Sequence, residues 1–77
     1  MVTILKRSGL RVVIFTDDHE PAHVHVFGDG EVKINLTEDG VELVWAYHMT
    51  RRDVRQSLAL VAEHRGAILG KWRAIHG

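Results

Sequence analysis

Polar and apolar residues alternate along much of the first half of the chain, which is typical of strands with one buried face. The segment Leu10–Thr16 is rich in β-branched residues and places Leu10, Val12 and Ile14 on one side. Similar strand-like segments are Val2–Leu5, His23–Phe27, Glu31–Leu36 and Val41–Ala46. Because the loops between them are short and polar, the pattern predicts an antiparallel meander of four or five strands.

The loop lengths predict how the central strands pair. Gly28-Asp29-Gly30 forms a three-residue hairpin loop, which places His25 opposite Lys33. In this register one face of the sheet is the core, formed by Val24, Val26, Val32, Ile34, Leu43 and Trp45. The other face is polar and open, and it carries His23, His25, Lys33, Asn35 and Glu42. A slip of one residue would bury the histidines and expose the valines, so the alternation fixes the register.

The last third of the chain changes to helical periodicity. Thr50 and Asp53 have the spacing of a capping box at the start of a helix. The apolar stripe that follows consists of Val54, Leu58, Val61, Ile68, Leu69, Trp72 and Ile75. We expect it to cover the valine face, which gives a small α+β fold. Arg65 interrupts the stripe, so either the helix bends near Gly66 or Arg65 extends past the edge of the stripe. The glycines favour the bend.

The chain has 77 residues and no cysteine, so we expect a single domain, residues 1–77, without disulfides. A core of this size contributes only about 3–5 kcal/mol, which favours a homo-oligomer or a stable partner. No apolar run approaches the roughly 18–20 residues of a membrane span, and the N-terminal segment does not match a signal peptide. The sequence therefore predicts a cytoplasmic protein that does not enter a membrane.

The formal net charge is zero, but the charges are segregated along the chain. Residues 17–42 are mainly acidic, and the predicted helix is basic, with Arg51, Arg52, Arg55, Arg65 and Arg73. Such a helix either complements the acidic sheet of its own molecule or binds RNA or an acidic protein partner.

The chemically distinctive segment is Asp18–His25, which contains three of the six histidines. Two of them, His23 and His25, are two residues apart on a predicted strand, so their rings share a face. In one interpretation these two and His19 bind a divalent transition metal, with Asp18 or Glu42 as an oxygen ligand.

A second interpretation requires no cofactor. A histidine oriented by a carboxylate takes a proton from a ribose 2′-hydroxyl, and Lys33 or Arg65 stabilises the charge of the transition state. In a third interpretation the histidines are simply an exposed polar face. The candidate catalytic residues are Asp18, His19, His23, His25, Lys33 and Glu42.

The motif D-H-x-P-x-H-x-H-V, which here begins at Asp18, resembles a family of short bacterial proteins, the domain of unknown function numbered 4160. The segments Glu42–Trp45 and Trp72–Gly77 also resemble that family. The matching residues are Asp18, His19, Pro21, His23 and His25 in the motif and Trp72 and His76 in the tail. The resemblance implies the toxin component of a type II toxin–antitoxin-like pair, with a cognate small protein encoded nearby as its partner.

We therefore expect a toxin that acts on RNA or on translation through its histidine-bearing sheet face. One alternative is a non-catalytic binding module, an antitoxin or adaptor, that uses the arginines of the helix. The other is a metal-dependent hydrolase that uses His23 and His25.

Overall fold

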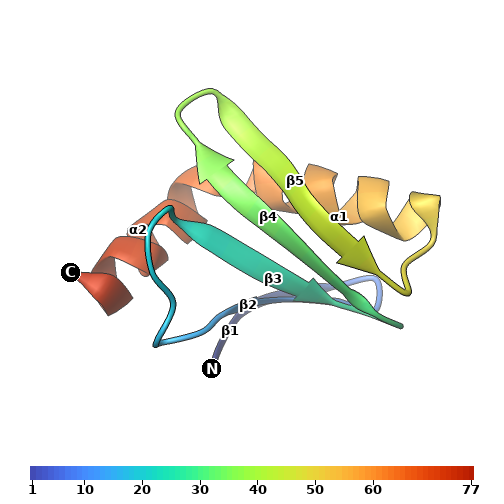
Figure 1. The fold of residues 1–77 in the computed structure, drawn as a ribbon, viewed down its shortest axis with the longest axis horizontal. Helices are drawn as coiled ribbons and strands as arrows, with labels where there is room; N and C mark the ends of the chain where they lie inside the picture. Colours follow the sequence, from blue (N-terminus) through green and yellow to red (C-terminus); the bar gives the residue numbers. More distant parts are fainter.

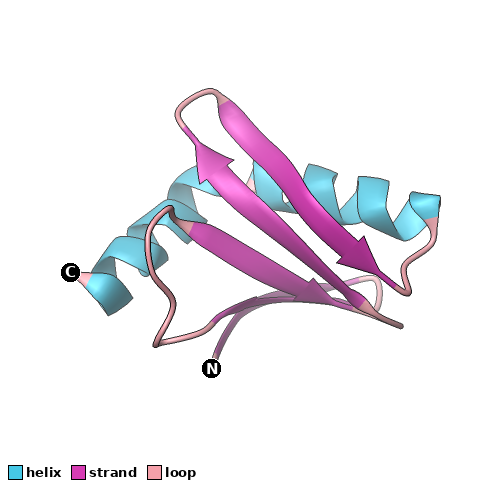
Figure 2. Ribbon diagram, in the orientation of Figure 1, coloured by secondary structure: helices cyan, strands magenta, loops and turns pink.

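The computed structural model describes residues 1–77 as one five-stranded antiparallel sheet followed by two helices (Figure 1). The strands pair in chain order, and α1 runs behind β4 and β5 (Figure 2). The elements are β1 (Val2–Arg7), β2 (Leu10–Ile14), β3 (His23–Phe27), β4 (Glu31–Thr37), β5 (Gly40–Tyr47), α1 (Arg51–Glu63) and α2 (Arg65–His76). The predicted α+β class and the meander are confirmed.

The register of the β3–β4 hairpin follows the sequence prediction. His25 pairs with Lys33, and His23 pairs with Asn35. Gly30 closes the hairpin where the chain approaches the end of β5, so closely that a Cβ atom on it would lie 1.9 Å from the carbonyl oxygen of Tyr47. Only glycine fits there without moving the backbone.

The register of β5 departs from the prediction halfway along the strand. Ile34 pairs with Leu43, but Lys33 pairs with Trp45, so Val44 is an extra residue that forms a bulge. The bulge moves Trp45 from the predicted core face to the histidine face. Leu43 keeps its predicted face, but it lies on the edge strand and is 42% exposed. The prediction that Leu43 and Trp45 are core residues is therefore wrong.

The core lies between the sheet and the helices. The predicted core residues Val24, Val26, Val32 and Ile34 are fully buried there. The complete cluster consists of Leu10, Val12, Ile14, Ala22, Val24, Val26, Val32, Ile34, Leu36, Leu60, Val61, Ile68 and Trp72. The backbone N–H of Asp53 donates to Oγ1 of Thr50 at 3.1 Å, which confirms the predicted helix start. Neither helix has the length and apolar character that crossing a membrane requires.

The helical segment is interrupted at His64, two residues before Gly66. His64 has φ −109° and ψ 17°, which ends α1 and starts α2 in a new direction. Arg65 then extends to the β4–β5 turn, where its Nε donates to the carbonyl oxygen of Gly40 at 3.0 Å and its guanidinium also bonds that of Thr37. The helix is therefore interrupted near Gly66, and Arg65 also extends past the apolar stripe, so both alternatives from the sequence are confirmed. The hydrogen bonds of Arg65 attach the start of α2 to the β4–β5 turn.

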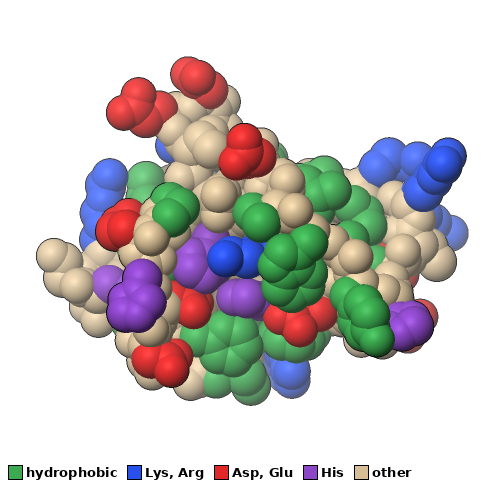
Figure 3. Space-filling view, viewed as in Figure 1, with side chains coloured by type: hydrophobic (Ala, Val, Ile, Leu, Met, Phe, Trp, Pro, Cys, Tyr) green, Lys and Arg blue, Asp and Glu red, His purple; other side chains and the backbone are tan.

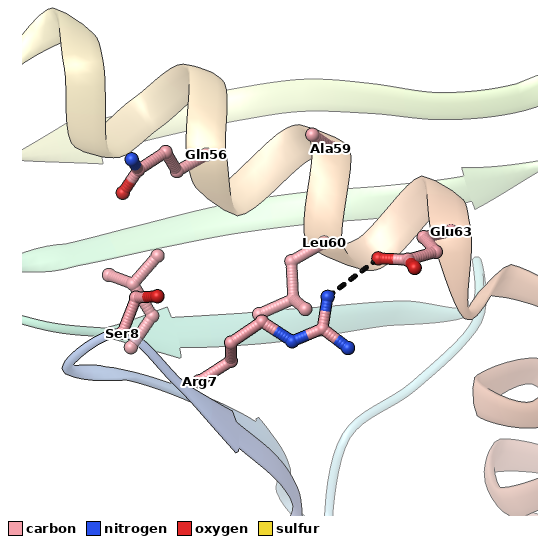
Figure 4. A pocket seen from close by; sticks show the side chains of 7 residues that line it. Arg7, Ser8, Gln56, Ala59, Leu60 and Glu63 are labelled. Carbon is pink, nitrogen blue, oxygen red and sulfur yellow. Dashed lines mark hydrogen bonds and ion pairs between the residues drawn. The ribbon is translucent and has the colours of Figure 1, made fainter.

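One ion pair connects the first strand to α1. Nη1 of Arg7 lies 2.8 Å from Oε2 of Glu63 across a shallow pocket (Figure 4). Both side chains are at least half exposed, and pairs of this kind contribute about 0–1 kcal/mol. No ion pair joins the basic residues of the helices to the acidic residues of the sheet, so the charge segregation is not neutralised within the molecule.

The close approach at Gly30 predicts a large effect of one methyl group. Gly30→Ala should lower the free energy of unfolding by about 2 kcal/mol or more, because the new Cβ would overlap the backbone of Tyr47 and His48. Gly70→Ala is the matched control. It lies in the middle of α2 with open space around it, and alanine there should stabilise the protein by about 0.5–1 kcal/mol. Urea denaturation measures both. Equal effects of the two substitutions would contradict the close approach.

Candidate metal centre

The histidine face is covered, not open as the sequence predicted. His23 is 5% exposed and His25 is 8% exposed. The ring of Phe15 packs edge-on against His25 with 4.6 Å between centroids, and Trp72 of α2 lies 5.1 Å from the ring of His23. The loop between β2 and β3 adds Asp18 beside them. Two buried imidazoles with aromatic neighbours are not a solvated polar surface, which argues against the third interpretation.

The Nδ1 atom of each imidazole already has a hydrogen-bond acceptor. Nδ1 of His23 donates to the carbonyl oxygen of Pro21 at 2.8 Å, across a loop in which the Glu20–Pro21 peptide bond is cis. Nδ1 of His25 donates to Oε2 of Glu31, also at 2.8 Å. A carbonyl and a carboxylate oxygen accept, so the proton of each neutral ring lies on Nδ1. In a neutral ring with this tautomer, the Nε2 atom has a free lone pair.

Both Nε2 atoms point toward one carboxylate oxygen. Oδ2 of Asp18 lies 3.1 Å from Nε2 of His23 and 3.8 Å from Nε2 of His25. This oxygen is buried, and no hydrogen bond of adequate geometry reaches it. The three residues each present one ligand atom to a group in which all atoms lie within 4.8 Å of one another. Ligands bound tetrahedrally at about 2.0–2.1 Å stand about 3.3 Å apart, which is close to the two distances from Oδ2 of Asp18 to the histidines.

The three residues line one wall of a cleft of about 300 Å³. Figure 3 shows the face opposite α1, where histidine side chains gather around a basic side chain with acidic and hydrophobic side chains beside them. The cleft is lined by Asp18, His19, Glu20, Pro21, His23, His25, Lys33 and Trp45. Any ion held by the triad would therefore be reached from this cleft.

The other predicted catalytic residues do not all lie in the histidine cleft. His19 and Lys33 line the same cleft, but neither belongs to the ligand group. Glu42 lies 3.5 Å from Nδ2 of Asn35 and lines a neighbouring cleft together with Arg65 and Arg73. The structure therefore does not bring Glu42 to the histidines.

The remaining arginines form a separate surface. Arg51, Arg52 and Arg55 are exposed on the first turns of α1, and Arg73 is exposed on α2. None of them lines the histidine cleft.

Glu31 is a site residue that the sequence analysis did not identify. It pairs with Phe27 and lies on the same face as His25, two positions along the sheet. The predicted register already placed Glu31 diagonally across from His25 on the same face. That position could have identified Glu31 as a partner of His25.

The tail of the chain also reaches this site. Trp72 belongs to the core as predicted, and its Nε1 donates to Oε1 of Glu20 at 3.4 Å. His76 stacks on Trp72 with 3.8 Å between ring centroids, and its Nε2 lies 3.2 Å from the carbonyl oxygen of Phe15. The two matching tail residues thus pack behind the histidine motif.

The model of the family called domain of unknown function (DUF4160) matches residues 9–73, and the chain belongs to this family. The match includes Asp18, both buried histidines and Trp72. No curated protein and no solved structure matches the chain.

The hydrogen bonds predict an unusual tautomer for both buried histidines. In metal-free protein the neutral rings of His23 and His25 should carry the proton on Nδ1, where the hydrogen bonds to Pro21 and Glu31 hold it. Long-range ¹H–¹⁵N NMR spectra of the rings distinguish the two tautomers. The exposed His48, whose ring lies 4.2 Å from that of Tyr47 and outside the cleft, serves as the internal control. Protons on Nε2 of both rings would remove the basis for a shared ligand site.

Proposed function

We propose that this family member binds one divalent transition-metal ion through Asp18, His23 and His25 and uses it for hydrolysis. The observation that carries the proposal is the convergence of Oδ2 of Asp18 with one ring nitrogen of each histidine, all within 4.8 Å of one another. Lone pairs of two imidazoles and a carboxylate repel one another unless a proton or a cation lies among them. A metal ion satisfies all three at once.

The ligand set supports an ion of borderline hardness. Two imidazoles and one carboxylate suit zinc and other divalent first-row metals, and the same combination occurs in catalytic zinc and non-haem iron sites. Metal-binding histidines usually donate their other N–H to a carboxylate or a carbonyl, as His25 does to Glu31 and His23 to Pro21. These contacts fix both rings before any ion binds.

An ion held by Asp18, His23 and His25 would have three protein ligands, and all three residues line the cleft. A divalent ion there would supply Lewis acidity that activates water for hydrolysis. In hydrolysis the water oxygen bonds to the electrophilic atom of the substrate, the bond to the leaving group breaks, and the leaving group takes up a proton. His19 lines the cleft outside the ligand group, so it is our candidate donor of that proton.

Substitution of the carboxylate distinguishes a metal site from a simple ion pair. In EDTA, Asp18→Asn should leave the melting temperature unchanged or raise it, because the amide can donate to Nε2 of His23. Added zinc at about 100 times its Kd should stabilise the wild type by about 2.7 kcal/mol and the variant far less. Thermal melts with and without zinc, together with zinc titration calorimetry, measure both effects.

The adjacent Asp17→Asn is the matched control, since Asp17 is exposed and lies outside the ligand group. It should bind zinc as the wild type does. If the wild type binds no zinc, nickel, cobalt or manganese and Asp18→Asn destabilises the metal-free protein, then Asp18 forms an ion pair with protonated His23. The metal-free acid–base interpretation would then take precedence.

A second candidate function, partner binding, is favoured by a groove between β5 and α1. The groove has an apolar floor and two arginines at its side, and its lining is Leu43, Ala46, Met49, Arg51, Val54 and Arg55. Because these arginines have no acidic partner in the molecule, the groove fits an amphipathic helix with acidic flanks. The toxin role and the cognate partner stay predictions.

Charge reversal tests the groove. A synthetic amphipathic peptide rich in leucine and glutamate should bind the wild type, and Arg51→Glu/Arg55→Glu should weaken it about 10-fold or more through like-charge repulsion. Lys71→Glu, an exposed charge on α2, is the control and should have little effect. Fluorescence anisotropy of the labelled peptide measures all three proteins. Equal affinities would reject the groove as the binding surface.

A further inference from the structure

We infer that the substrate of the cleft is a nucleotide unit of single-stranded nucleic acid, whose phosphate contacts Lys33 and the metal ion and whose base stacks on Trp45. The inference rests on the proposed function, because it names the substrate of the same site. It is carried by two side chains that the ligand group does not use. They lie directly opposite each other on β4 and β5 and line the same cleft.

Lys33 is a cation without a partner in a cleft that contains acids. It forms no ion pair and no side-chain hydrogen bond. None of the nearby acids pairs with Lys33: Asp18 faces the two histidines, Glu31 accepts from His25, and Glu20 accepts from Trp72. An ammonium group left free beside a metal site is suited to an anionic ligand, and lysine commonly binds phosphate in this way.

Trp45 adds a flat apolar surface beside that cation. The bulge at Val44 turns its side chain onto the histidine face, where its ring lies 6.1 Å from that of His25. It remains 40% exposed, although the core offers the usual place for tryptophan. A small carboxylate or inorganic phosphate would use Lys33 but would leave this ring unused. A ligand with a planar base uses both, since bases of any sequence stack on aromatic side chains.

The dimensions of the cleft limit the ligand further. A volume of about 300 Å³ lies at the lower end of small-molecule sites and accommodates about one nucleotide unit. A base in a duplex is already stacked on its neighbours, so the base on Trp45 must come from a single strand. The reaction is then phosphodiester hydrolysis. The water oxygen bonds to phosphorus, the phosphorus–oxygen ester bond breaks, and the released oxygen takes up the proton.

Binding of a short single-stranded RNA oligonucleotide tests the inference. The labelled RNA is titrated with wild-type protein in zinc and in EDTA, and fluorescence anisotropy reports the affinity. Trp45→Leu should weaken binding about 5- to 150-fold, the range for loss of one base–aromatic stack. Lys33→Gln should weaken binding and reduce its dependence on salt concentration. Inorganic phosphate as competitor should lose affinity in Lys33→Gln but not in Trp45→Leu.

Tyr47→Leu is the matched control. Tyr47 is an exposed aromatic residue on the same strand and face, but it does not line the cleft, so RNA affinity should stay at the wild-type level. Circular dichroism melts verify that each variant folds. Zinc titration without RNA measures the metal centre separately. If zinc binds normally but RNA does not bind, or binds equally to wild type, Lys33→Gln and Trp45→Leu, the nucleotide site is rejected. The metal centre is then still supported. RNA affinity that depends on both residues supports the nucleotide site whether or not zinc binds.

Discussion

The two-residue period of β3 is the constraint on which the rest of the structure depends. Val24 and Val26 enter the core, so His23 and His25 must project from the opposite face of the same strand. A shift of register by one residue would exchange the two sets, with a large loss of hydrophobic burial. The hydrophobic effect that holds the sheet to the helices therefore also fixes the position of the two imidazoles.

Burial of those imidazoles has an electrostatic consequence. Removing polar atoms from water is unfavourable unless each finds a partner, and Nδ1 of both rings does so with Pro21 and Glu31. The same bonds orient the two Nε2 atoms toward Oδ2 of Asp18, a buried oxygen without a hydrogen-bond partner. A fold that satisfies Nδ1 of each ring and brings the two Nε2 atoms together beside a carboxylate has a geometry compatible with a metal ion. This is the physical reason for favouring a cation over an unpaired polar cluster.

The bulge in β5 gives the cleft a second kind of surface. One extra residue, Val44, reverses the side on which Trp45 projects and brings it opposite Lys33. An aromatic ring and a free ammonium group thus flank the ligand triad at little cost to the core, because Trp72 of α2 fills the interior instead. Bulges often redirect side chains next to functional sites in this way.

The meander, the β3–β4 register and the helix start at Thr50 could all be predicted from the sequence, because alternation, loop length and capping are local properties of the chain. It also identified Asp18, His23 and His25 as members of one motif. The burial of the histidines, the bond from His25 to Glu31 and the exit of Trp45 from the core became visible only in the folded structure. Those outcomes depend on how a loop folds across the sheet and on one unpaired residue in an edge strand. Contacts between segments distant in sequence determine the loop conformation and the bulge. The pattern of polar and apolar residues does not reveal such contacts.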